Sequence, residues 1–241
     1  MNAENSLSKA KQAPLTELDT SEAKSLLDPV FNGKFAPPTL PPPHYQKIVL
    51  NLPNKSINQI LEEAFERAKV DVKTKFNFAF LGSEGCGKTA LIGNLLGGNL
   101  GEEPRETSTR WTSSAIPEVV FWELQTNNWE ESWFESQQLY IYDALVMVCV
   151  DHYAENELAI IKKALQWKIP LFFVLNKAEL ATESEGKLAS LKELVQQQLE
   201  PLGLFQPFLY TTSTVQSEER LISFDEDKLM SDIVLVVSSR Q

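Results

Sequence analysis

The chain has 241 residues, of which 43% are hydrophobic and 23% charged, the usual composition of a folded globular protein. Its formal net charge of −11 argues against a nucleic-acid partner, because binding phosphate backbones requires clustered lysine and arginine. Two cysteines, Cys86 and Cys149, provide no disulfide framework, so we expect a reducing, cytoplasmic compartment. No stretch is long and apolar enough for a membrane span. These observations predict one sizeable domain and a tail.

The N-terminal residues 1–45 are polar and end in the proline-rich stretch A-P-P-T-L-P-P-P-H. Because proline favours extended geometry and lacks a backbone donor, we expect a disordered tail over 1–45 and a folded domain over 46–241. The tail is either a docking segment for a proline-recognition module or a spacer. After it, Ser56 and Gln59 form a capping-box pattern and apolar residues recur at helical spacing as far as Ala68, which predicts a short helix.

From Lys75 onward, apolar runs alternate with amphipathic stretches, which predicts a mostly parallel sheet flanked by helices on both faces. The expected strands are Phe76–Leu81, Val119–Leu124, Ala144–Val150, Leu171–Leu175 and Phe208–Thr211. The expected helices are Lys88–Leu96, Trp129–Gln138, Ala154–Trp167, Ser184–Leu199 and Glu226–Val237. In such sheets, ligands bind beyond the carboxyl ends of the strands.

Residues 82–89 read G-S-E-G-C-G-K-T, directly after the first expected strand and directly before a helix. The glycines Gly82, Gly85 and Gly87 let the chain turn so that backbone N–H groups point at a di- or triphosphate. We expect Lys88 to reach the β- and γ-phosphates and the Thr89 hydroxyl to bind Mg²⁺. The order of strand, loop and helix predicts a P-loop NTPase fold, an α/β three-layer sandwich. The expected nucleotide contacts also include Ser83, Glu84, Cys86 and Ala90.

Cys86 has two interpretations. It is either a small residue that fills the loop or a redox-sensitive thiol, since a helix N-terminus lowers the pKa of a cysteine.

The expected strand Leu171–Leu175 runs straight into Asn176, Lys177, Ala178 and Glu179, which is the NKxD pattern with a glutamate in the last place. In guanine-binding proteins that carboxylate accepts two hydrogen bonds from the base, the lysine stem lies along the ring, and the asparagine ties loops together. Adenine lacks this pair of donors, so the pattern favours guanine; the alternative is a polar turn that matches by chance. An adenine-nucleotide kinase is disfavoured because no arginine-rich lid segment follows the loop.

With further segments, these motifs resemble the immunity-related GTPases, an interferon-inducible family of dynamin-like GTPases, over about residues 56–238. The segments are E-T-S-T-R-W-T at 106–112, I-P-E-V-V-F-W-E-L at 116–124, Y-D-A-L-V-M-V at 142–148 and E-N-E-L at 155–158. The resemblance implies that residues 82–89 bind the phosphates and Mg²⁺, and that Thr107 or a neighbouring hydroxyl is the switch I ligand of the metal. It also implies that Asn176, Lys177 and Glu179 read guanine.

The segment Thr211–Ser213 resembles the short loop that closes over the base in this family, with Thr212 and Ser213 as contacts. Lys88, Thr107 and Glu123 are the catalytic residues that the resemblance implies. It further implies GTP or GDP with Mg²⁺ as ligands, a homodimer through the nucleotide face, and a role in innate immunity. A cytoplasmic protein with peripheral contact to intracellular membranes is the corresponding location.

The chain departs from the family pattern at three places. Where the family has D-x-P-G or D-x-x-G, this chain has Glu123, Leu124, Gln125 and Thr126. The longer Glu123 loosens the geometry that holds a Mg²⁺-bound water, and the glycine that approaches the γ-phosphate is missing. Glu179 is lengthened in the same way, and we expect the chain to lack the family's helical C-terminal domain. Two hypotheses follow: a GTP-binding protein with weak or dimer-assisted hydrolysis, or a pseudo-GTPase scaffold with little or no turnover.

Overall fold

A computed structural model describes residues 42, 44–45, 54–97, 100–125, 132–181, 186–213 and 224–238 of the chain. Among these residues the strands are β1 (Phe76–Leu81), β2 (Leu100–Pro104), β3 (Ser108–Ser113), β4 (Val119–Leu124), β5 (Ala144–Cys149), β6 (Leu171–Leu175) and β7 (Leu209–Thr211). They form one sheet in the order β2-β3-β4-β1-β5-β6-β7. The pairings from β4 to β7 are parallel, whereas β2 and β3 add an antiparallel hairpin at one edge.

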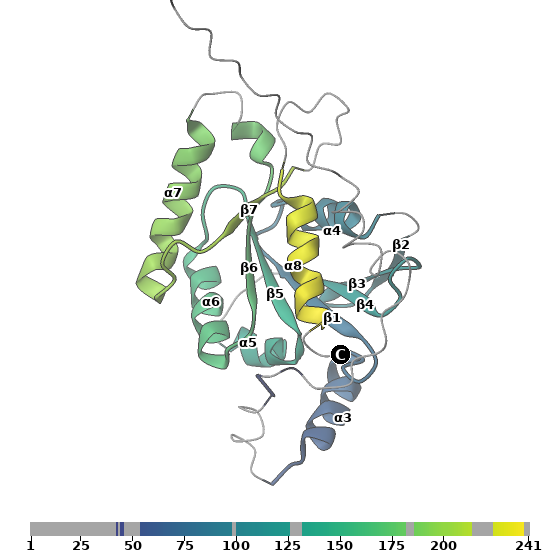
Figure 1. Cartoon of the computed structure of the whole chain (residues 1–241). Coiled ribbons are helices and arrows are strands. Elements are labelled where there is room, and N and C mark those ends of the chain that lie inside the picture. Colours follow the sequence, from purple (N-terminus) through teal and green to yellow (C-terminus); the bar gives the residue numbers. More distant parts are fainter. Residues whose placement is uncertain are drawn as a thin grey trace, which may run out of the picture.

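The helices of the described part are α3 (Ile57–Ala68), α4 (Lys88–Leu96), α5 (Trp133–Ser136), α6 (Glu155–Trp167), α7 (Lys187–Leu199) and α8 (Glu226–Ser238). Three short 3-10 helices accompany them, namely η1 (Leu139–Ile141), η2 (Ala178–Ala181) and η3 (Glu200–Leu202). Figure 1 shows α6 and α7 to one side of the sheet, α8 and α4 to the other, and α3 beyond the lower end of the strands.

Helices cover both faces of the sheet because the central strands carry apolar side chains on both faces. In β1, the rings of Phe76, Phe78 and Phe80 pack with α4 and α8 in one buried cluster. Ala79 and Leu81 point the other way, into a second cluster that includes residues of α3, α5, α6 and α7. This alternation gives the three layers that the sequence predicted, so the α/β sandwich is confirmed.

A buried polar network attaches the segment after α3 to the sheet. The Asn77 side chain donates to the backbone oxygens of Asp71 and Lys75 and accepts a hydrogen bond from the Trp122 indole at 2.9 Å. The Asp143 carboxylate accepts the Asn77 backbone N–H at 2.6 Å. Because these hydrogen bonds lie within the domain, the network stabilises the fold.

The five predicted strands are confirmed, as are the predicted helices after the loop other than Trp129–Gln138, with shifts of a few residues at their ends. The β2–β3 hairpin was missed, because Leu100–Pro104 contains glycine and proline and is exposed along its whole length, without alternation. The predicted helix Trp129–Gln138 is instead the short α5 followed by η1, and its first residues, 129–131, lie outside the described part, as do residues 184–185 of the next predicted helix.

The domain boundary expected after residue 45 is too late. Tyr45 is 1% exposed and donates its hydroxyl to the Ile141 backbone oxygen at 2.6 Å. The His44 ring hydrogen-bonds the Tyr140 oxygen at 2.9 Å, and Pro42 is buried too. These residues therefore belong to the packed domain; residues 1–41 lie outside the described part. Within the described residues, no helix combines the length and apolar character that crossing a membrane requires.

Candidate nucleotide-binding site

The phosphate loop connects β1 to α4 at the carboxyl end of the sheet's central strand. A Cβ built on Gly82 would lie 2.1 Å from the Val148 backbone oxygen and 2.8 Å from the Cys86 sulfur, so the loop packs too closely for any side chain there. Gly85 and Gly87 adopt φ values of 75° and 89°, which glycine takes without strain. The glycines predicted from the sequence are thus required by the observed backbone.

Lys88 lies inside this loop. Its ammonium donates to the backbone oxygens of Gly82 at 2.7 Å and Ser83 at 3.2 Å, and only 8% of the residue is exposed. It is also the first residue of α4, whose N-terminal N–H groups carry partial positive charge. A buried ammonium next to a helix N-terminus makes this an anion site suited to phosphate.

Thr89 and Glu123 meet at the ends of α4 and β4. The Thr89 hydroxyl donates to Glu123 Oε1 at 2.8 Å, and the Trp111 indole donates to Oε2 at 3.3 Å. The longer carboxylate therefore reaches the hydroxyl expected to bind the metal and is held there by a second donor. Hydroxyl and carboxylate oxygens are hard donors of the kind Mg²⁺ prefers, so these two residues fit that ion.

Asn176 connects three segments that are far apart in the sequence. It is fully buried, and its Nδ2 donates to the backbone oxygens of Cys86 at 2.9 Å and Gly87 at 3.3 Å. Its Oδ1 accepts the Thr212 hydroxyl hydrogen bond at 2.8 Å. The phosphate loop, the end of β6 and the end of β7 are therefore joined by one side chain, the tie that the NKxD pattern predicts.

The other expected base contacts follow on the same rim. Lys177 has a left-handed φ of 56°, and Glu179 lies in η2. The Ala178 N–H donates to the Thr212 oxygen at 3.0 Å, which sets these residues beside the segment after β7. In that segment, Ser213 N–H donates to Glu226 Oε1 at 2.9 Å at the start of α8. The structure thus gathers both sequence-predicted base loops at one place.

Glu157 is a contributor that sequence reasoning missed. This carboxylate on the first turn of α6 is 2% exposed. Its Oε1 accepts the Ser83 hydroxyl at 2.8 Å, and its Oε2 accepts the Ala154 N–H at 2.7 Å. A buried acid therefore fixes the second residue of the phosphate loop against α6. The only signal in the sequence was the glutamate three residues into the expected helix, which is typical of a helix start.

Cys86 does not have an activated thiol. It is 3% exposed, and burial raises its pKa above the ordinary value of 9.0, although the nearby Lys88 opposes that shift. The expectation that the helix N-terminus lowers this pKa is therefore wrong, because desolvation outweighs it. The sulfur packs against Gly82, as a residue that fills the loop does.

Thr107 is set apart from the loop. It lies on the exposed turn between β2 and β3, where its backbone oxygen accepts the Gln125 N–H at 3.0 Å. Among the described residues, its side chain forms no hydrogen bond or ion pair with Lys88 or Thr89. Thr126, where the family glycine is missing, lies outside the described part.

The described residues also lack any cluster of three or more His, Cys, Asp or Glu side chains that would hold a metal.

Comparisons with known proteins agree with this geometry. A model of the interferon-inducible GTPase (IIGP) family matches residues 46–202, more than half of the chain. No curated protein matches at a significant level. A matching solved structure is the apo form of translation elongation factor SelB from Methanococcus maripaludis, 13% identical, with a TM-score of 0.47. The match covers 70% of this chain and 34% of that one, a likeness too slight to bear on function.

Proposed function

This chain belongs to the interferon-inducible GTPase family, and from that premise we propose that it binds GTP and GDP with Mg²⁺ and hydrolyses GTP slowly. The observation that carries the proposal is the buried Asn176, which bonds the phosphate loop on one side and Thr212 on the other. A phosphate site and a base site joined in this way suit a whole nucleotide better than a lone phosphate. The pattern of residues 176–179 favours guanine as the base.

In the proposed complex, the backbone N–H groups of residues 82–89 and the Lys88 ammonium hold the phosphates. The ammonium exchanges its bonds with the Gly82 and Ser83 oxygens for phosphate oxygens. Lys177 lies along the base, and Glu179 accepts its N–H groups. Thr212 and Ser213 close the base site from the other side.

Magnesium is the proposed metal, with the Thr89 hydroxyl as its protein ligand and Glu123 holding that hydroxyl. The ion would supply charge neutralisation between the β- and γ-phosphates. Thr107 is the proposed switch I ligand. Because it sits on the exposed β2–β3 turn, it has to approach the loop when GTP binds, which makes this turn the moving part of the site.

Weak turnover is the second part of the proposal. Glu123 occupies the place of the family aspartate, and Gln125 and Thr126 stand where a D-x-x-G motif would continue. We expect a slow reaction that is assisted by a second copy of the chain across the nucleotide face. The alternative is a scaffold without turnover. Cytoplasmic location, peripheral membrane contact and a role in innate immunity rest on the family alone.

Titration calorimetry tests the nucleotide assignment. GTP and GDP should bind more tightly than ATP, and Lys88→Ala should weaken GTP binding by about 10- to 150-fold, the loss of a charged hydrogen-bond pair. Lys162→Ala is the matched control, because Lys162 is exposed on α6 away from the loop. Equal affinities for GTP and ATP, or no binding of either at millimolar concentration, would contradict the proposal.

Single-turnover GTP hydrolysis at several protein concentrations tests the mechanism. A rate constant that rises with protein concentration supports assistance by a second copy. A slow rate constant that does not change with protein concentration agrees with GTP binding but contradicts assistance by a second copy of the chain. Tight GTP binding without measurable turnover favours the scaffold.

A further inference from the structure

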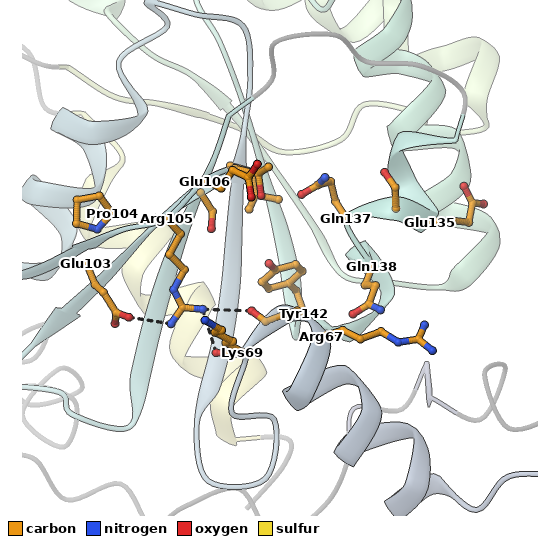
Figure 2. A pocket seen from close by; sticks show the side chains of 15 residues that line it. Arg67, Lys69, Glu103, Pro104, Arg105, Glu106, Glu135, Gln137, Gln138 and Tyr142 are labelled. Carbon is orange, nitrogen blue, oxygen red and sulfur yellow. Dashed lines mark hydrogen bonds and ion pairs between the residues drawn. The ribbon is translucent and has the colours of Figure 1, made fainter.

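A polar cavity lies on the sheet face opposite α4, between the end of α3, the β2–β3 hairpin and α5. Its volume is about 740 Å³, within the range of small-molecule sites. Figure 2 shows its lining, which includes Arg67 and Lys69 from the end of α3, Arg105 from the hairpin, and Gln138 and Tyr142. Lys88, Thr89 and Asn176 do not line it, whereas Glu106 and Thr107 of the β2–β3 turn do, so the cavity adjoins the proposed nucleotide site at that turn without including the phosphate loop.

Gln138 is the most unusual group in this cavity. Its backbone has a left-handed φ of 52°, which residues other than glycine seldom adopt. The residue is only 9% exposed, and its buried Oε1 accepts no hydrogen bond from the part of the chain that the structure describes. A buried acceptor of this kind destabilises a protein unless a ligand or water pairs with it. A water molecule or a ligand in the cavity would supply the missing donor.

The charges that line the cavity are equal in number but unevenly paired. Three bases line it, together with the acids Glu103, Glu106 and Glu135. Glu103 pairs with Arg105 at 3.1 Å within the lining and with Arg110 at 3.2 Å outside it, and Glu135 pairs with Lys163 at 2.8 Å.

Arg67 and Lys69 are left with little compensation. Within the part of the chain that the structure describes, the one ion pair of Arg67 is with Glu63 at 3.9 Å, and that carboxylate already bonds Lys55 at 2.5 Å. Among the described residues, Lys69 forms no ion pair. The end of α3 therefore presents two weakly paired positive charges to one side of the cavity, and these attract an anion.

Beyond the proposed function, we infer that this cavity binds a small hydroxylated organic anion, of which a sugar phosphate is the simplest case. The anionic group lies against Arg67 and Lys69 at the rim. A hydroxyl of the ligand donates to Gln138 Oε1 deeper in the cavity. Because the site requires both a negative charge and a hydrogen-bond donor, its preferred ligand is neither an anion without a hydroxylated carbon skeleton nor a neutral polyol.

Calorimetry with glucose 6-phosphate tests the assignment, with glucose and inorganic phosphate as ligands that carry only one of the two chemistries. Glucose 6-phosphate should bind roughly tenfold or more tightly than either. Lys69→Gln should weaken binding by about tenfold, whereas Lys73→Gln, on an exposed lysine outside the lining, should leave it unchanged. Equal binding of glucose 6-phosphate and phosphate, or no binding, overturns the inference.

Two variants separate this site from its alternatives. Gln138→Met removes the unpaired acceptor at similar volume, so it should raise the midpoint of thermal unfolding by about 2–4 °C while weakening glucose 6-phosphate binding roughly tenfold. Lower stability or unchanged binding in this variant counts against the inference. Lys88→Ala should leave glucose 6-phosphate binding intact. If that variant abolishes it, the anion binds at the phosphate loop and the cavity is not its site.

Discussion

The phosphate loop and the β2–β3 hairpin lie at the same end of the sheet, yet the fold holds them very differently. In the loop, the buried Lys88 ammonium donates to the Gly82 oxygen, and the Asn176 side chain donates to the Cys86 oxygen. In the hairpin, every residue of β2 is exposed, and Thr107 sits on an exposed turn. The phosphate loop is therefore part of the domain core. The β2–β3 turn, which we propose responds to the γ-phosphate, instead lies near the edge of the sheet, where a change of conformation requires little free energy.

The largest expected effect comes from breaking the tight packing of the loop. Gly82→Ala would place a methyl group 2.1 Å from the Val148 oxygen, which belongs to a central strand that has no room to retreat. We expect the free energy of unfolding to fall by roughly 3 to 5 kcal/mol through overpacking and strain, and GTP binding to be lost. Urea denaturation followed by tryptophan fluorescence measures the first effect.

Gly85→Ala is the matched control for that variant. A Cβ at Gly85 would meet nothing within 4 Å, although φ is 75°. Only backbone strain remains, so the loss should be about 1 to 2 kcal/mol. If the two alanine variants unfold at the same urea concentration, close packing around Gly82 is not what fixes the loop.

A smaller effect is expected from replacing Asn176, whose side chain joins the phosphate loop to the end of β7. Asn176→Ala removes the donors to the Cys86 and Gly87 oxygens and leaves the Thr212 hydroxyl without its acceptor. We expect a loss of about 2 to 3 kcal/mol in stability, together with weaker GDP binding, since phosphate and base loops are no longer joined. Denaturation and calorimetry on the same preparation measure both.

Asn156→Ala provides the comparison for Asn176, because Asn156 is exposed on α6 and, among the residues that the structure describes, its side chain accepts only the adjacent Glu157 N–H. Its change should stay within about 0.5 kcal/mol. If Asn176→Ala has the same stability and GDP affinity as Asn156→Ala, the buried hydrogen bonds of Asn176 are dispensable.

The same contrast explains what the sequence could predict. Buried strands such as Phe76–Leu81 and the glycine spacing of the loop have local signatures, because burial and backbone geometry constrain the residue types directly. The hairpin Leu100–Pro104 has none, since an exposed edge strand imposes no pattern. The bond from Ser83 to Glu157 joins positions 74 residues apart, so only the folded chain reveals it. The pocket around Gln138 likewise depends on three elements meeting.

The smallest stability effect is expected at the hairpin, and it is the sharpest test of the comparison. Thr107 is exposed, and its contact with Gln125 uses the backbone oxygen, which an alanine retains. Thr107→Ala should therefore change stability by less than about 0.5 kcal/mol and leave GDP binding unchanged. If Thr107 moves to the metal when GTP binds, the variant should weaken only a non-hydrolysable GTP analogue, only with Mg²⁺ present, and Thr107→Ser should restore it. Calorimetry with both nucleotides, with and without Mg²⁺, decides this. If the variant loses the same affinity for GDP and for the analogue, the hairpin supports the phosphate loop whichever nucleotide is bound. The contrast between a fixed phosphate loop and a movable β2–β3 turn would then be wrong.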